Sequence, residues 1–250
     1  MRRLPASRRV VVDAGRAARS RHSIHGLLTV DVTAAHRVLT GAEGAPTLTG
    51  WVVWCVAQAA AEHPEVHAGR DLRNRLVVFE GVDVNVSVET SFQGRSFPMN
   101  HVLRSVHDRT PADLSGELHA IKRDPGASPT MAMAGRARIY LRLPGFVRSG
   151  LLRLLHRLPA VQRRLAGTIG VTSVGMFGEG EGWGIAFQMH TLDVVVGGMS
   201  VRPGFGEDGG LEPRRCLHLT LSFDHDVVDG APAARFAARL RELMETAAGM

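Results

Sequence analysis

Cysteine is nearly absent from the 250-residue chain: only Cys55 and Cys216 occur, and both lie in apolar stretches. Two such residues cannot form the disulfide framework of a small secreted domain, and no zinc-ligand spacing surrounds them. We therefore interpret both as core residues and expect no metal site. This cysteine usage fits a reducing compartment, so we expect the protein to be cytoplasmic.

Long hydrophobic runs and aromatic residues are also scarce. No run of 18 apolar residues occurs, which argues against a membrane-spanning helix. The basic N-terminal stretch, residues 1–21, lacks the apolar core and the cleavage pattern of a secretory signal. Only 5% of the residues are aromatic, and neither an aromatic RNA-binding motif nor zinc-finger spacing is visible. We therefore expect no nucleic-acid partner.

Positive charge is abundant by comparison. The net charge is +6, and nearly all of the positive charge is arginine, whose planar fork suits phosphate and carboxylate recognition. The strongly basic segment 138–165 has a helical pattern divided by Pro144 and Pro159. It could lie on an acidic membrane surface, but Phe146 is its one apolar aromatic anchor. We favour a pair of helices packed on the domain and do not expect membrane contact.

Hydrophobic periodicity predicts strands and helices without strict alternation. Strands are expected at 25–33, 167–177, 182–187, 192–201 and 214–224. Two further strands are expected within 75–90, separated by a turn at Gly81. Helices are expected from Thr33 to residue 39, and at 50–62, 99–110, 111–124, 138–165 and 230–248. This order is not that of a doubly wound sheet. It predicts a single α+β domain over residues 1–250, with a mixed sheet packed against helices.

The stretch "LSFDHDVVDG", residues 221–230, raises the question of chemistry. A strand-like run delivers His225 between two aspartates, followed by Asp229 and Gly230. Imidazole titrates near neutral pH, a nearby carboxylate can orient it or bind an arginine, and glycine lets the chain turn into a helix. Asp229 could equally be the cap of that helix, and the strand could simply end in a solvated turn. Spacing alone leaves both interpretations open.

Three segments carry a resemblance to a known family. "LSFDHDVVDGAPAARFAARLRELME" resembles the C-terminal signature of the catalytic domain of 2-oxoacid dehydrogenase acyltransferases (dihydrolipoamide acyltransferases), which reads DHRxxDG before an Ala-rich helix. Chloramphenicol acetyltransferases carry the related HHxxxDG. "GTIGVTSVGMFG", residues 167–178, resembles the family's GTFTISNLGMFG, and "HGLLTVDVTA", after a basic N-terminal helix, resembles its opening strand. The resemblance covers residues 8–248, most clearly 167–248, and implies a chloramphenicol-acetyltransferase-like two-layer domain.

The family implies an acyl-transfer mechanism. His225 corresponds to the general base that takes the proton of a thiol, and a hydroxyl on the upstream strand stabilises the oxyanion. Thr172 stands at the family's serine position and Ser173 at its asparagine position. Because side chains alternate between the faces of a strand, only one of the two can point toward the histidine, and we favour Thr172.

The family also implies an ion pair that holds the histidine's strand in place. Asp229 is implied to pair with an arginine of the opening helix. Arg16 and Arg19 are the candidates, and we choose Arg16. Asp224 is expected to be structural or solvated. So is Asp226, which stands where the family has arginine.

The substrates and the assembly follow from the same resemblance. It implies coenzyme A as an acyl thioester substrate, a small-molecule or lipoyl acceptor, and a homotrimer or a cage of trimers. The chain shows no lipoyl or peripheral-subunit-binding domain, so we expect no covalently bound lipoyl group. The family's Asn-Pro-Pro is replaced by "FQM", residues 187–189, and segment 138–165 has no clear counterpart, so the acyl group cannot be inherited from the family. The alternative is a non-catalytic structural or binding subunit of a dehydrogenase-type assembly.

Overall fold

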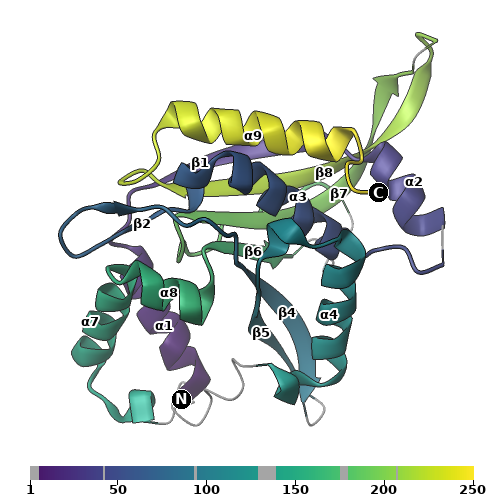
Figure 1. Ribbon diagram of the computed structural model, residues 1–250. Helices are drawn as coiled ribbons and strands as arrows, with labels where there is room; N and C mark the ends of the chain where they lie inside the picture. Colours follow the sequence, from purple (N-terminus) through teal and green to yellow (C-terminus); the bar gives the residue numbers. More distant parts are fainter. Residues whose placement is uncertain (1–5, 42, 93–94, 129–138, 175–179, 207) are drawn as a thin grey trace.

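A mixed six-stranded sheet forms the centre of the molecule (Figure 1). The computed structural model describes residues 6–41, 43–92, 95–128, 139–174, 180–206 and 208–250. The strand order is β1-β8-β7-β6-β4-β5, with parallel pairing of β6 to both of its neighbours and antiparallel pairing elsewhere. The strands are β1 (Ser23–Asp31), β4 (Val84–Phe92), β5 (Arg95–Leu103), β6 (Ile169–Ser173), β7 (Leu192–Phe205) and β8 (Leu211–Asp224). A small separate ladder joins β2 (Gly69–Arg70) to β3 (Leu76–Val77).

One face of the sheet is covered by α3 (Leu48–Glu62), α4 (Pro111–Arg123) and α9 (Gly230–Glu245). Every second residue of β8, from Leu217 to Phe223, points into this core beside residues of α3 and α9. The α3 helix is apolar on nearly all sides because the sheet and the two other helices surround it. The predicted α+β fold with a mixed sheet is confirmed.

The opposite face of the sheet is partly covered by α1 (Ala6–Ala18), α7 (Gly145–His156) and α8 (Pro159–Ala166), which group together in Figure 1. The helices α7 and α8 begin after Pro144 and at Pro159, as predicted, because proline is tolerated in the first turn of a helix but not in its interior. Nε of Arg148 donates to the buried Asp13 of α1 at 2.6 Å. The basic segment therefore packs on the domain as a helical pair. None of the described helices is long and apolar enough to cross a membrane.

Two expected elements differ from the structure. Residues 99–110, predicted as a helix, form the second half of β5 and a 3-10 turn over Val106–Asp108. Met99, His101 and Leu103 alternate into the core, so strand pairing with β4 overrides a pattern that also matches a helix. Residues 182–187, predicted as a strand, make no ladder, and the end of the predicted strand 167–177 lies outside the described residues.

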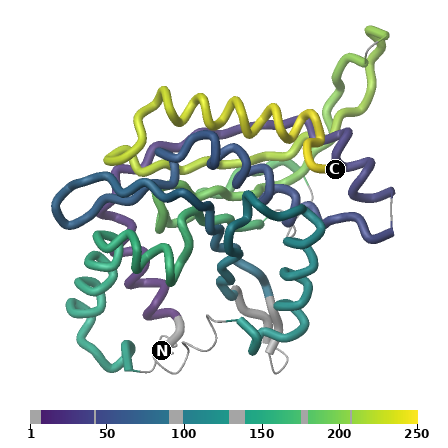
Figure 2. Tube along the Cα trace, viewed as in Figure 1, coloured from purple at the N-terminus to yellow at the C-terminus, as the bar shows by residue number. Residues whose placement is uncertain are grey.

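The β7–β8 hairpin projects from the body of the molecule, as the trace in Figure 2 shows. β1 pairs with β8 only from Cys216 onward, so the preceding part of β8 has β7 as its partner among the described strands. This two-stranded ribbon exposes Val201, Phe205 and Leu211. Isolated ribbons of this kind are only marginally stable in water.

The α2 helix (Thr33–Gly41) and the 3-10 turns over Pro64–His67 and Pro125–Ala127 also lie among the described elements.

Candidate active site

His225 opens the turn that joins β8 to α9. Its backbone N–H donates to the carbonyl of His22 at 2.8 Å, which fixes the chain at this point. The imidazole is 44% exposed, and its Nδ1 lies 3.6 Å from Oδ1 of Asp229. That separation is too long for a hydrogen bond, so the ring is accessible and only loosely oriented by the carboxylate.

The expected pairing of Asp229 with Arg16 is not made. Asp229 occupies the N-cap position of α9, but its side chain makes no capping hydrogen bond and is 85% exposed. Arg16 lies 3.9 Å from Asp13 on its own helix. Helix α1 packs against α7 instead of reaching the start of α9, which separates the two side chains.

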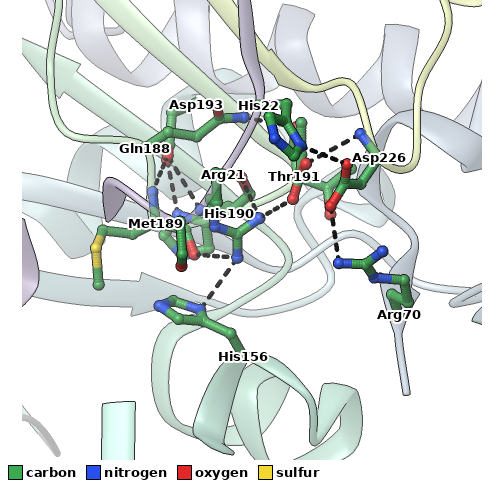
Figure 3. Close-up of polar contacts among 12 residues, drawn as sticks. Arg21, His22, Arg70, His156, Gln188, Met189, His190, Thr191, Asp193 and Asp226 are labelled. Atoms are coloured by element: carbon green, nitrogen blue, oxygen red, sulfur yellow. Dashed lines mark hydrogen bonds and ion pairs between the residues drawn. The ribbon is translucent and has the colours of Figure 1, made fainter. Parts of the chain in front are cut away.

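The role of the expected ion pair is taken by Arg21 and Asp224. The Arg21 guanidinium donates to the carboxylate of Asp224, the last residue of β8, and both side chains are largely buried. It also donates to the carbonyl of Met189 at 3.2 Å and to Nδ1 of His156 at 3.1 Å (Figure 3). One arginine therefore joins the end of β8, the loop before β7 and helix α7.

Asp226 is the second aspartate of the motif, and it is also paired. It accepts from Nδ1 of His22 at 2.8 Å and from Nη2 of Arg70 at 2.8 Å. The hydrogen bond from His22, followed by the charge of Arg70, lowers the pKa of Asp226. The charge at this strand end therefore consists of two anchoring carboxylates, Asp224 and Asp226, on either side of His225.

Replacing Arg21 by methionine is expected to lower the free energy of unfolding by about 3–5 kcal/mol, because the buried Asp224 carboxylate would lose its partner. Urea denaturation followed by circular dichroism measures the change. The double variant Arg21→Met/Asp224→Asn should recover part of the loss, and Arg19→Met, at an exposed neighbour, should change it little. A loss below about 1 kcal/mol for the single variant, the size of one ordinary hydrogen bond, would contradict the anchoring role.

By contrast, Asp229→Asn is expected to change the free energy of unfolding by no more than about 0.5 kcal/mol, the usual range for exposed substitutions. The reason is that its side chain is 85% exposed and caps nothing. Thermal denaturation at neutral pH checks this. A large loss would mean that Asp229 has a buried partner in the assembled protein.

Thr172 and Ser173 face opposite sides of the sheet. Thr172 lies between Ser87 of β4 and Val195 of β7 and lines a cavity of about 200 Å³. Ser173 lines a smaller cavity of about 50 Å³ against α4, beside His119 and Lys122. This alternation puts the two hydroxyls in different surroundings, as the strand pattern predicts.

The larger cavity lies between the sheet and the α7–α8 pair. Its floor is made by side chains of β4, β5, β6 and β7, and its roof by α7, α8 and the loop before β7. The polar residues that line it are Asn85, Ser87, Asn100, His156, Gln162, Thr172, His190 and Asp193, and the apolar ones include Leu155, Phe187, Met189 and Val195.

A buried histidine–aspartate pair forms part of the cavity wall. Nδ1 of His190 lies 2.7 Å from Oδ1 of Asp193, and its Nε2 lies 2.8 Å from the carbonyl of Ala166. Burial opposes ionisation of Asp193, but His190 and two backbone N–H groups outweigh it and lower its pKa. Gly170 faces this pair, and a Cβ there would lie 1.9 Å from the Asp193 carboxylate. The pair therefore requires glycine at position 170.

His156 has a defined proton arrangement. The Arg21 guanidinium can only donate, so Nδ1 of His156 accepts and the ring proton lies on Nε2. Burial, and then the charge of Arg21, lower the pKa of His156 to about 4, so the ring is neutral near pH 7. Nε2 of His156 and Oδ1 of Asn85 are buried and have no hydrogen-bond partner among the described residues.

His225 and Thr172 do not meet within one chain. The strand register places Thr172 level with Thr220 of β8, five residues before His225. At the rise of a β-strand this is about 16 Å along the sheet, and two strand spacings add about 10 Å across it. A site that uses both groups therefore needs two copies of the chain.

Several site residues were missed by the sequence analysis. Arg21 lies in the basic N-terminal arm, and nothing in its local pattern separates it from Arg16 or Arg19. His156 lies in the basic segment 138–165, whose pattern predicts only a helix, and the spacing of His190 and Asp193 is a weak signal without the fold. Within the described ranges, no group of three or more His, Cys, Asp or Glu side chains could hold a metal ion.

The C-terminal part of the chain is similar to a known protein family. Residues 161–250 match the model of the family "2-oxoacid dehydrogenases acyltransferase (catalytic domain)". The resemblance to this family is confirmed. The matched segment begins in α8 and includes Thr172, the His190–Asp193 pair, His225 and α9.

A curated relative agrees with this. The chain is 31% identical over 80 residues to the lipoamide acyltransferase component of the branched-chain alpha-keto acid dehydrogenase complex of Bacillus subtilis (strain 168). The match covers 32% of this chain and 19% of that protein, so it spans about a fifth of the relative's length.

Solved structures of the acyltransferase family share the fold over nearly the whole chain. Dihydrolipoamide acetyltransferase of Azotobacter vinelandii superposes with a TM-score of 0.69 at 19% identity, covering 98% of this chain and 91% of that one. The truncated catalytic core of the 2-oxoacid dehydrogenase complex of Thermoplasma acidophilum gives 0.67 at 22% identity, covering 98% and 97%. A chloramphenicol acetyltransferase gives 0.56 at 13% identity, covering 93% and 94%. The predicted chloramphenicol-acetyltransferase-like fold is confirmed.

Proposed function

We propose that the chain is an acyltransferase that moves an acyl group between coenzyme A, or a lipoylated partner, and a thiol or other acceptor. The observation that carries this proposal is the family match over residues 161–250, which includes both the His225 turn and the Thr172 strand. The structure of the Azotobacter enzyme comes from a study of the roles of a serine, a histidine and an asparagine in its catalytic mechanism. The asparagine lies four positions after the histidine. By the motif, these positions correspond to Thr172, His225 and Asp229.

In the proposed mechanism, His225 acts as the general base. Its Nδ1 faces Asp229, which leaves Nε2 to take the proton of the attacking thiol. The thiolate forms a bond to the acyl carbon, and the Thr172 hydroxyl donates a hydrogen bond to the oxyanion that results. The intermediate then expels the second thiolate, which recovers the proton from His225.

We also propose that the active site lies between copies of the chain in a homotrimer or a cage of trimers. Support comes from the separation of His225 and Thr172 along the sheet and from the exposed apolar residues of the projecting β7–β8 ribbon. The structural neighbours include the cubic core of a pyruvate dehydrogenase complex, with a TM-score of 0.70 at 20% identity. We retain the cytoplasm as the proposed location.

A basic cleft of about 240 Å³ beside the His225 turn supports a phosphorylated substrate such as an acyl-coenzyme A. Arg70, Arg153 and Arg157 line it, together with Arg21 and with Asp226 next to His225. Arg21 and Arg70 are already engaged by aspartates. Nε and Nη2 of Arg157 already donate to Asp71 and Asn74. Arg153 and Nη1 of Arg157 are therefore the groups we propose for the phosphates, because guanidinium groups suit phosphate oxygens.

A non-catalytic structural or binding subunit is the second candidate. The observation that favours it is the loose support of His225, whose nearest carboxylate is itself 85% exposed. Calorimetric titration with acetyl-coenzyme A, with and without dihydrolipoamide, separates the two candidates. Saturable binding and transfer of the acetyl group to the thiol would support the enzyme, whereas a stable assembly that neither binds nor transfers would support the structural subunit.

A further inference from the structure

The cavity above Thr172 contains two polar atoms that the fold leaves unused. Nε2 of His156 and Oδ1 of Asn85 are buried there without a hydrogen-bond partner among the described residues. Buried polar atoms are nearly always hydrogen-bonded. Two unused atoms in one cavity therefore indicate that something else occupies it, either a ligand or ordered water.

The two atoms offer one donor and one acceptor. The contact with Arg21 places the ring proton of His156 on Nε2, so this atom can only donate. The side chain of Gln162 on α8 lies near His156 and raises its pKa, against the larger lowering by burial. Its amide nitrogen donates to the carbonyl of Met189 at 3.0 Å, and it makes no hydrogen bond of good geometry with Nε2 of His156. Oδ1 of Asn85 can only accept. A hydroxyl group would satisfy both atoms, and a carbonyl oxygen would satisfy His156.

The charges around the cavity favour a neutral ligand. Arg21 is compensated by Asp224, and His190 is hydrogen-bonded to Asp193. No uncompensated cation lies among the described residues that line the cavity. A carboxylate that entered it would be buried without a positive charge to compensate it, which is costly.

The position of the two atoms limits the length of the ligand. Asn85 lies opposite Gly170, two residues before Thr172 on the same face of β6. Asn85 and Thr172 are therefore roughly 8 Å apart across neighbouring strands. With hydrogen bonds of about 3 Å at each end, the space between them suits a short acyl chain.

We propose that this cavity selects a short acyl group that carries a neutral oxygen, a hydroxyl or a carbonyl, on carbon 3 or 4 of the acyl chain, where the thioester carbonyl is carbon 1. His156 donates to that oxygen, and Asn85 accepts from it when it is a hydroxyl. The inference rests on the proposed acyl transfer, with the thioester carbonyl at Thr172. His156 comes from the segment that departs from the family pattern, so this specificity would belong to this chain.

The test compares three thioesters of similar length: butyryl-, 3-hydroxybutyryl- and succinyl-coenzyme A. We expect kcat/KM for 3-hydroxybutyryl-coenzyme A to exceed that for butyryl-coenzyme A by about tenfold or more, because the apolar chain leaves a buried donor unpaired. Succinyl-coenzyme A should be the poorest of the three. Calorimetric dissociation constants provide a second measure that does not depend on turnover.

Two variants of His156 separate the donor from the contact with Arg21. In His156→Asn, the amide oxygen can still accept from Arg21, but the Nε2–H donor is lost. The ratio of kcat/KM between 3-hydroxybutyryl- and butyryl-coenzyme A should then fall to within about twofold of unity, because the hydrogen bond that separates the two substrates is missing. In His156→Gln, an amide N–H can reach the Nε2 position, so part of the preference should remain. His119→Asn, on the exposed side of α4, is the matched control and should leave the preference unchanged.

The outcomes distinguish this inference from the function on which it rests. If no thioester binds or reacts, both are rejected. If all three react but butyryl- and 3-hydroxybutyryl-coenzyme A are equivalent, acyl transfer stands, the specificity is wrong, and the unused atoms are satisfied by water. The specificity would also be overturned by a preference that persists in His156→Asn.

Discussion

Replacing His225 by alanine is expected to lower kcat/KM for thioester transfer by about 10²–10⁴-fold, the usual contribution of a general base. The imidazole is 44% exposed at the end of β8, and the structure holds its position through the backbone rather than through the ring. The substitution should therefore leave the fold intact. Steady-state rates with acetyl-coenzyme A and dihydrolipoamide, together with circular dichroism, measure the two effects separately.

The controls for this variant separate a chemical role from a structural one. His119→Ala removes an exposed imidazole from α4 and should retain full activity. Asp229→Asn, which leaves His225 in place, should reduce the rate far less than His225→Ala does. If His225→Ala keeps its activity to within about tenfold, below the range of base catalysis, His225 is not the base.

The fold was predictable where a segment carries its own pattern. α9 has a buried face at helical spacing, and α7 and α8 begin at prolines, so their bounds were close to those expected. The structure of segment 99–110 was not predictable in this way, because Met99, His101 and Leu103 are buried by the pairing of β5 with β4. Where a residue pattern fits both a helix and a strand, tertiary contacts decide between them, and a single sequence does not show those contacts.

The candidate site divides in a similar way. His225 and Thr172 could be found because they sit in two motifs with a recognisable spacing. The pairing of Arg16 with Asp229 was wrong, because several arginines in the N-terminal arm share the same local pattern and only the fold selects Arg21. His156, Asn85 and the His190–Asp193 pair come from separate elements, so their meeting in one cavity depends on the packing of α7 and α8 over the sheet.

Replacing Thr172 by valine is expected to lower the transfer rate by about 10²–10³-fold, the usual loss for one oxyanion donor. Valine has nearly the shape of threonine but lacks the hydroxyl, so the strand and the cavity should be retained. Thr172→Ser restores the donor and is the matched control, which should keep most of the activity. Equal activity of the valine and serine variants would exclude the hydroxyl as the donor.

The sharper test mixes two inactive variants. If His225 of one copy faces Thr172 of the next, refolding equal amounts of His225→Ala and Thr172→Val chains should restore activity. In randomly mixed cyclic trimers, about one interface in four would combine an intact histidine with an intact threonine. The recovered rate should therefore approach a quarter of the wild-type rate, far above that of either variant alone.

A site within one chain could not be repaired in this way, because every chain in the mixture carries one defect. The separation of His225 and Thr172 by five residues along β8 and by two strands already makes such a site difficult to form. Light scattering must show a trimer or a larger assembly, and exchange of labelled subunits must be demonstrated. Exchange without any recovery of activity would exclude the shared site, and a monomer would exclude the trimer on which it depends.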